Sequence, residues 1–203
     1  PIVPEGFDIS LFTVSATDMA GDYHDTVQLR DGRIVIVLGD VTGHGVSASL
    51  AMAMAKATLV YVGNEGQTFP TIFMDKLNEL FGGELKASRK KMTLVTVVVN
   101  PTTRYLEIDN AGQSFPRYYA SNSQTSFDIE LPSVPIGAMK RRKPGLFSRT
   151  MEPGDAIILY TDGIIECLND KSEMYGYNRF NEAFENSIKK GCSADETIRA
   201  MMK

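Results

Sequence analysis

The chain has 203 residues, of which 43% are hydrophobic and 23% are charged, a composition typical of a globular domain. With 25 acidic and 21 basic residues the formal net charge is -4, so there is no basic excess to favour a nucleic-acid partner. Cys167 and Cys192 are too few for a disulfide framework, and we expect a cytoplasmic location. No signal pattern and no run of about 20 apolar residues occurs, so no membrane span is expected.

The first half of the chain is predicted to form strands followed by a helix. Residues 7–14 have the composition of a strand. Apolar-rich runs at 26–30 and 33–38 flank Asp31-Gly32, and Asp-Gly between two such runs is the strongest short-range signal for a hairpin. The apolar segment 46–62 carries several polar residues and is predicted to be a buried helix rather than a membrane span.

The second half repeats the alternation of hairpins and helices. A one-sided apolar stripe predicts a helix over 71–81, and runs at 92–99 and 104–110 around Pro101 predict a second hairpin. Further expected elements are strands at 118–119, 127–131 and 156–160, a helix over 177–189, and a last helix that starts with the capping box of Ser193 and Glu196. Hairpins with helices grouped between them favour an α+β layered domain over βαβ units.

The first hairpin brings two aspartates together. If Asp31 and Gly32 are a two-residue turn, Tyr23 lies opposite Asp40. Asp22 then reaches the same open end of the hairpin as Asp40, one position out of step. Opposed side chains lie about 5 Å apart, so the two carboxylates can share a cation, and without a cation they would repel each other strongly.

A third aspartate follows the same pattern. The apolar run 156–160 leads into Asp162 and Gly163, just as 34–38 leads into Asp40. Each aspartate alone is compatible with ordinary strand-end or turn chemistry, but Asp22, Asp40 and Asp162 together favour a metal site. Oxygen ligands suit Mg²⁺ or Mn²⁺ better than zinc. Carboxylates at strand ends commonly hold two such ions about 3.5–4 Å apart, an arrangement that activates water and clamps a phosphoryl group.

Five motifs in this order resemble those of the SpoIIE/RsbU-type bacterial protein serine phosphatases, a branch of the PP2C (PPM) metal-dependent phosphatases. They are Ala20-Gly21-Asp22-Tyr23-His24-Asp25, residues 39–45, Asn110-Ala111-Gly112, Glu152-Pro153-Gly154-Asp155 and residues 160–166. The resemblance covers essentially the whole chain. It implies a single PP2C-like domain over 1–203 with two packed antiparallel β-sheets flanked by helices, an αββα sandwich whose C-terminal strand lies outside this chain.

The resemblance also implies a catalytic site. Asp22 and Asp40 match metal-binding aspartates of the family, with Asp40 as the bridging ligand. The Val41 carbonyl matches a backbone ligand, and Asp162 matches a ligand of the second ion. Two Mn²⁺ or Mg²⁺ ions would activate a bridging water that attacks a phosphoserine or phosphothreonine directly, without a covalent phosphoenzyme. The family's last metal-binding aspartate has no counterpart before Lys203, so it either follows this chain or is missing.

Several other residues near these motifs have two open interpretations. His44 could donate a proton to the leaving alkoxide, or it could brace its loop by hydrogen bonds. Gly43 and Gly45 would let the backbone approach a metal ion or the substrate phosphate closely. His24 is expected to be a strand-face residue beside the site and not a ligand. The basic run 140–143 is predicted to be an exposed loop tip, either simply solvated or a landing site for an acidic phosphoprotein.

The favoured function is therefore a metal-dependent protein serine/threonine phosphatase. The resemblance implies a phosphorylated STAS-type anti-sigma-factor antagonist as the substrate, control by an attached or separate sensor domain, and a possible homodimer. One alternative is a degenerate, non-catalytic module that binds phosphoproteins. Another is a different two-metal enzyme such as a nucleotidyl cyclase, but the sequence offers no purine pocket or phosphate-binding basic residue for it.

Overall fold

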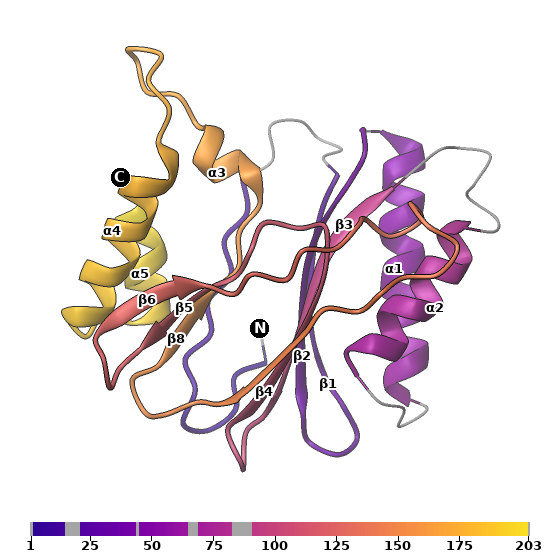
Figure 1. Ribbon diagram of the computed structural model, residues 1–203, viewed down its shortest axis with the longest axis horizontal. Helices are drawn as coiled ribbons and strands as arrows, with labels where there is room; N and C mark the ends of the chain where they lie inside the picture. The colour runs from indigo at the N-terminus through magenta and orange to yellow at the C-terminus, as the bar shows by residue number, and fades with distance from the viewer. Residues whose placement is uncertain (1, 15–20, 44, 65–68, 83–90, 203) are drawn as a thin grey trace.

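The computed structural model describes residues 2–14, 21–43, 45–64, 69–82 and 91–202 (Figure 1). Within these ranges a five-stranded antiparallel sheet has the order β1-β2-β3-β4-β7, and a three-stranded antiparallel sheet has the order β6-β5-β8. The strands are β1 (Asp22–Gln28), β2 (Ile34–Val41), β3 (Met92–Asn100), β4 (Tyr105–Ala111), β5 (Arg117–Ala120), β6 (Thr125–Asp128), β7 (Leu146–Thr150) and β8 (Ala156–Ile158). The helices are α1 (Val46–Asn64), α2 (Thr71–Gly82), α3 (Asp162–Glu166), α4 (Gly176–Lys189) and α5 (Ala194–Met201).

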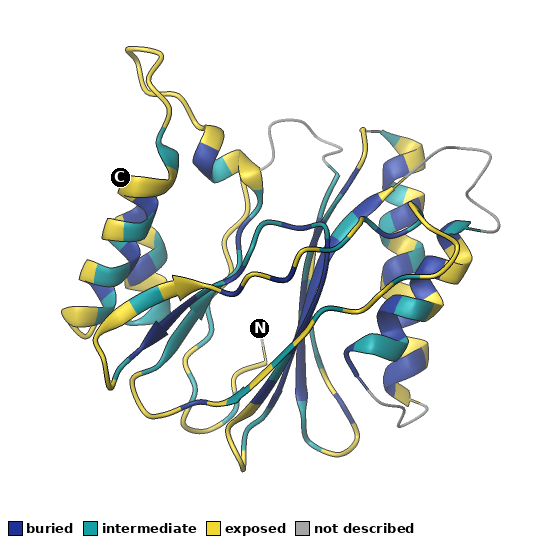
Figure 2. Cartoon of the chain, in the orientation of Figure 1, coloured by how far each residue is buried: buried dark blue, intermediate teal, exposed yellow. Residues whose placement is uncertain are grey.

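Three hydrophobic clusters hold four layers together, in agreement with the predicted αββα sandwich. The first lies between the helices α1 and α2 and the larger sheet, and the second lies between the two sheets. The third joins the smaller sheet to α4 and α5. Because β2 and β3 have a hydrophobic layer on each face, they are buried along most of their length (Figure 2). This explains why 34–38 is an unbroken apolar run rather than an alternating one.

The helix α1 is, among the described residues, the only one long and apolar enough to cross a membrane. By length and composition alone, a core helix passes the same test. Its small and aliphatic side chains pack against the larger sheet in the first cluster: Ala48, Ala51, Ala55, Leu59 and Val62. These side chains form the buried face of α1 that the sequence predicts, whereas Val46, Leu50, Val60 and Tyr61 on the same helix are exposed.

The β1–β2 hairpin has a register one residue away from the predicted one. The amide of Leu29 donates to the carbonyl of Arg33 at 2.8 Å, and the amide of Gly32 donates to the carbonyl of Leu29 at 3.0 Å, so the loop contains three residues and not two. Gly32 has a φ of 87°, the left-handed conformation that closes a three-residue hairpin loop. Asp22 therefore lies directly opposite Asp40. The predicted meeting of the two aspartates is confirmed, and the predicted offset is wrong.

Other sequence predictions have mixed outcomes. The second hairpin, the four long helical segments and the capping box at the start of α5 are confirmed. Residues 7–14 form no strand. Phe7 instead packs against the layer between the sheets, and the carboxylate of Asp8 accepts a hydrogen bond from the amide of Ala194 at 2.7 Å. The strand β7 and the short helix α3 were not predicted.

The prediction of an exposed loop tip at 140–143 is wrong for Arg142. Its side chain is 1% exposed, and its guanidinium donates to both carboxylate oxygens of the fully buried Asp109 at 2.6–2.9 Å. Asp75 on α2 lies 3.7 Å from Arg142 Nε. A carboxylate buried on β4 requires a compensating charge, and this arginine supplies it. The neighbouring residues Lys140, Arg141 and Lys143 are exposed.

Candidate metal centre

Two strand ends bring Asp22 and Asp40 face to face. Asp22 on β1 is the register partner of Asp40 on β2, and Asp40 is in turn the partner of Thr93 on β3. Along β2, Ile36 and Leu38 pack toward the smaller sheet. Since side chains alternate along a strand, Asp40 lies on this same face. The two carboxylates therefore lie at the end of the layer between the sheets, and both are half-buried.

Asp162 approaches this pair from the other sheet. It is the first residue of α3 and follows β8 by a short connection, and its side chain is exposed. In Figure 1, α3 lies at the same end of the molecule as the upper ends of β1 and β2. Burial and then the charge of Asp162 raise the pKa of Asp22, against an opposing effect of His24. The structure thus brings the three predicted aspartates within electrostatic reach of one another.

The same electrostatics act on Asp40. Burial, the charge of Asp22 and the charge of Asp162 all raise the pKa of Asp40, against an opposing effect of the Val41 amide. Burial first, and then the charges of neighbouring carboxylates, disfavour the ionised forms of Asp22 and Asp40. A divalent cation between them would supply the missing charge and reverse both shifts.

Gly21 leaves space for a converging set of oxygen atoms. A β-carbon on residue 21 would lie 2.4 Å from the Val41 carbonyl oxygen, 2.7 Å from Asp40 Oδ1 and 3.1 Å from the Gly43 carbonyl oxygen. The Val41 amide donates to the Gly21 carbonyl at 3.0 Å, which holds the two backbone segments together. One carboxylate and two carbonyl oxygens around one small space form a hard-oxygen donor set that fits Mg²⁺ or Mn²⁺. Sequence reasoning had not identified this role of Gly21.

This arrangement is not a closed ligand shell. Among the described residues, no three His, Cys, Asp or Glu side chains are gathered closely enough to hold a metal ion. Asp22 and Asp40 are opposed, and Asp162 acts on them from an exposed position at the end of α3. The donor set fits a metal ion, but Asp162 would have to move closer to become a ligand.

The loop after β2 contains the remaining predicted site residues. Gly43 and Gly45 have φ values of 81° and 84°, a conformation that favours glycine. Their contact with a substrate phosphate stays a prediction, and His44 lies outside the described residues. His24 is exposed, and its Nδ1 lies 3.2 Å from Thr13 Oγ1, so it is a strand-face residue beside the aspartates, as expected.

A second network, which sequence reasoning missed, ties α1 to β1 near the site. Lys56 Nζ on α1 lies 2.5 Å from Asp25 Oδ2, and the hydroxyl of the buried Tyr23 donates to the same oxygen at 3.1 Å. These side chains lie on the face of β1 that packs against α1, opposite the face that carries Asp22. The network therefore supports the strand without entering the metal site.

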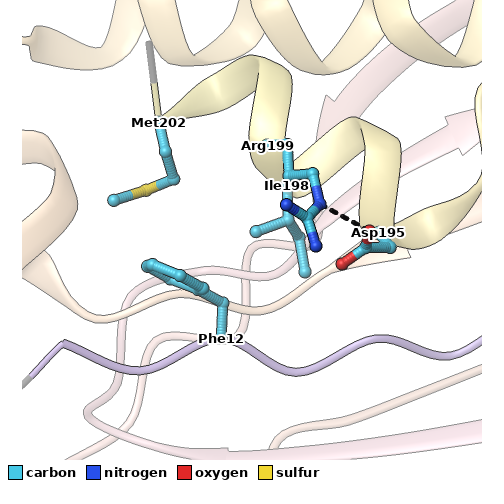
Figure 3. Close-up of a pocket in the computed structure, with 5 residues that line it drawn as sticks. All are labelled: Phe12, Asp195, Ile198, Arg199 and Met202. Atoms are coloured by element: carbon cyan, nitrogen blue, oxygen red, sulfur yellow. Dashed lines mark hydrogen bonds and ion pairs between the residues drawn. The ribbon is translucent and has the colours of Figure 1, made fainter.

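A separate surface depression of about 430 Å³ lies between α5 and the N-terminal segment (Figure 3). Its lining residues are Phe12, Asp195, Ile198, Arg199 and Met202. The guanidinium of Arg199 is paired with Asp195 at 2.6 Å, so this polar pair is already satisfied within α5. None of the predicted metal-site residues lines the depression.

Comparison with known proteins identifies the class of this fold. The fold matches the PP2C domain of SiaA from Pseudomonas aeruginosa with a TM-score of 0.75 and 19% sequence identity, over 91% of this chain and 72% of that one. It also matches the catalytic domain of the serine/threonine phosphatase PstP, solved with two manganese ions, with a TM-score of 0.61 and 15% identity, over 94% of this chain and 87% of that one. The fold is therefore that of the PP2C-type phosphatase domains.

The sequence narrows the class to one family. A family model described as Stage II sporulation protein E (SpoIIE) matches residues 30–203, and the chain belongs to this family. The phosphoserine phosphatase RsbU of Bacillus subtilis (strain 168) is 29% identical over 163 residues, which are 80% of this chain. The chain spans 48% of the length of that relative.

Proposed function

We propose that this chain is the catalytic domain of a metal-dependent protein serine/threonine phosphatase. The observation that carries the proposal is the direct opposition of Asp22 and Asp40, with the charge of Asp162 acting on both. Carboxylates that repel one another have a physical reason to lie together if they bind cations. Membership of the SpoIIE family and the similarity to the phosphoserine phosphatase RsbU support the same reading.

The residues have distinct roles in this proposal. Asp40, opposed to Asp22 and next to the Val41 carbonyl, would serve as a ligand of both ions, and Asp162 would be a ligand of the second ion. Two Mn²⁺ or Mg²⁺ ions, when bound, supply charge neutralisation for the phosphoryl group and activation of the attacking water. Gly43 and Gly45 in the loop after β2 have no side chain that would obstruct a phosphoserine on a protein surface as it enters the site.

The substrate we propose is a phosphoserine or phosphothreonine on a bacterial signalling protein, specifically a STAS-type anti-sigma-factor antagonist. The similarity to the phosphoserine phosphatase RsbU supports phosphoserine as the group that is hydrolysed. Because Asp162 is exposed, its carboxylate is accessible to a folded protein substrate. Because relatives are longer than this chain, a sensor domain and a dimer partner are proposed as its regulators.

A second candidate function is a non-catalytic module that binds phosphoproteins. It is favoured by one observation, namely that the described residues contain no gathered cluster of three ligands. Isothermal titration calorimetry with Mn²⁺ distinguishes the phosphatase from the non-catalytic module. Two bound ions per chain support the phosphatase, whereas one weak ion or none, with phosphoprotein binding retained, supports the module.

The proposed activity is tested by hydrolysis of p-nitrophenyl phosphate and of a phosphoserine peptide by the full-length protein with Mn²⁺. The Asp40→Asn variant should lose about 100-fold or more in kcat/KM, since a lost ligand removes several kcal/mol of transition-state stabilisation. Asp31→Asn is the matched control, because Asp31 lies at the opposite, exposed end of the same hairpin and an asparagine can keep its turn hydrogen bond. Equal rates for wild type and Asp40→Asn would refute the proposal.

A further inference from the structure

An exposed hairpin lies between α3 and α4 and projects beyond the rest of the molecule (Figure 1). We call residues 167–175 the arm. Leu168 and Met174 form an antiparallel bridge within it. On either side of this bridge the Tyr175 amide donates to the Cys167 carbonyl at 2.8 Å, and the Asn169 amide donates to the Glu173 carbonyl at 3.0 Å. The arm is therefore a short hairpin ribbon held by one bridge and its two flanking backbone hydrogen bonds.

The tip of the arm is held by its own hydrogen bonds. Asn169 Oδ1 accepts from the amides of Lys171 at 2.9 Å and Glu173 at 3.0 Å, and Asn169 Nδ2 donates to Glu173 Oε2 at 3.0 Å. The Ser172 amide donates to the Asn169 carbonyl at 2.9 Å. A loop ordered in this way loses little conformational freedom when a partner binds, and such preorganisation favours recognition.

The arm presents apolar side chains to solvent on one face. Leu168 is 61% exposed and Met174 is 58% exposed. As bridge partners they lie directly opposite each other, so their side chains share one face of the ribbon. The neighbouring Tyr175 lies on the other face and packs against the cluster that contains Phe180 and Phe184. The base of the arm is thus anchored, while its apolar pair is presented outward.

The arm begins a few residues along the chain from Asp162 of the proposed metal centre. Asp162 is the first residue of α3, which ends at Glu166, and Leu168 follows two residues later. The helix contributes about 6 Å and the two following residues add at most about 7 Å, so the Cα atoms of Asp162 and Leu168 are no more than about 14 Å apart. An extended peptide advances about 3.3 Å per residue, so about four substrate residues are enough to span this distance.

Charge restricts the kind of segment that can lie along this path. Between the start of α3 and the end of the arm there are four carboxylates and one ammonium group: Asp162, Glu166, Asp170, Glu173 and Lys171. All five residues are exposed. An acidic segment would be repelled here, whereas an apolar, uncharged segment meets the exposed leucine and methionine. The unbranched methionine adapts to side chains of different shape.

We propose that the arm is a docking site for the phosphoprotein substrate, and that Leu168 and Met174 bind an apolar side chain about four residues from the phosphoserine. The flank that binds carries no acidic residues. The inference rests on the proposed phosphatase function and adds to it a substrate preference determined outside the metal centre. Burial of one large apolar side chain against the pair corresponds to about tenfold in affinity.

Three synthetic phosphoserine peptides of equal length test this inference. They carry leucine, serine or glutamate at the fourth and fifth positions on both sides of the phosphoserine. With Mn²⁺, the full-length wild type should prefer the leucine peptide over the serine peptide by about tenfold in kcat/KM, and the glutamate peptide should be poorest. The double variant Leu168→Ser, Met174→Ser should reduce the preference for leucine over serine to less than about twofold, through KM rather than kcat.

Two controls separate docking from general damage. Hydrolysis of p-nitrophenyl phosphate, which is too small to reach the arm, should be unchanged in the double variant. The matched variant Tyr105→Ser, Leu146→Ser, which removes two similarly exposed side chains from β4 and β7, should keep the wild-type peptide preference. Equal rates on the leucine and serine peptides in wild type, or an unchanged preference in the double variant, would overturn the docking role.

Binding gives a readout that does not depend on turnover. If wild type hydrolyses neither p-nitrophenyl phosphate nor any peptide, the proposed phosphatase function fails. Fluorescence anisotropy of fluorescein-labelled peptides then tests peptide binding by the arm independently of catalysis. About tenfold tighter binding of the leucine peptide, lost in the double variant, supports docking. Equal binding of the leucine and serine peptides contradicts it.

Discussion

Replacing Asp40 by asparagine should change stability in opposite directions with and without metal. Asp40 and Asp22 are directly opposed, so their side chains lie about 5 Å apart. Two unit charges at this distance repel by about 3 kcal/mol at an effective dielectric constant of 20, and solvent screening of these half-exposed groups reduces this to about 1 kcal/mol. In EDTA, the Asp40→Asn variant should therefore melt about 2–4 °C above wild type.

Bound Mn²⁺ should make wild type melt above the Asp40→Asn variant. At a free Mn²⁺ concentration 100 times its Kd, a bound ion stabilises wild type by about 2.7 kcal/mol, whereas the variant has lost the bridging carboxylate and should gain much less. Calorimetric melting in EDTA and in Mn²⁺ measures both effects, and Asp31→Asn, at the far end of the hairpin, should follow wild type in both. A variant that is less stable than wild type in EDTA, or that gains as much from Mn²⁺, would refute the reasoning.

The pH dependence of stability in EDTA tests whether the ionised Asp22 and Asp40 destabilise the folded protein. In the metal-free protein the folded-state pKa values of Asp22 and Asp40 are raised. Groups of this kind contribute stability that is fully present below their unfolded pKa, near 4, and that is lost as pH rises through the folded pKa. The advantage of Asp40→Asn over wild type in EDTA should therefore be full at neutral pH and disappear below about pH 4.

Three further substitutions test other parts of the fold. Arg142→Ala leaves Asp109 buried and unpaired and should cost about 3–5 kcal/mol in urea denaturation, whereas Arg142→Met combined with Asp109→Leu should recover most of the loss. Gly21→Ala places a methyl group 2.4 Å from the Val41 carbonyl oxygen and should weaken Mn²⁺ binding in a calorimetric titration, while Gly82→Ala, which meets open space, should not. Burial alone would raise the pKa of Asp155, but hydrogen bonds outweigh this effect and lower the pKa. Asp155 therefore contributes stability above about pH 4 that is lost in more acidic solution. In a plot of unfolding free energy against pH, Asp155→Asn should reduce the loss of stability at acidic pH.

Local patterns in the sequence determined most of the secondary structure. Apolar periodicity predicted α2 and α4, and a capping box predicted the start of α5, because these signals act within a few residues of one another. The same local signals, extended by an Asp-Gly turn, predicted that Asp22 and Asp40 reach one end of a hairpin. Residues 7–14 show the limit of this reasoning, since strand composition does not reveal whether a neighbouring strand is available for pairing.

Only the tertiary structure decided the features that depend on distant residues. An Asp-Gly pair is compatible with a two-residue or a three-residue loop, and the conformation of Gly32 selected the register that opposes Asp22 and Asp40. The burial of Arg142 depends on a carboxylate 33 residues away on β4, which no local pattern reveals. The charge of Asp162 acts on the other two aspartates only because the two sheets pack face to face. The sequence by itself therefore indicated which side chains could form the site, and the packing of the layers determined how closely they meet.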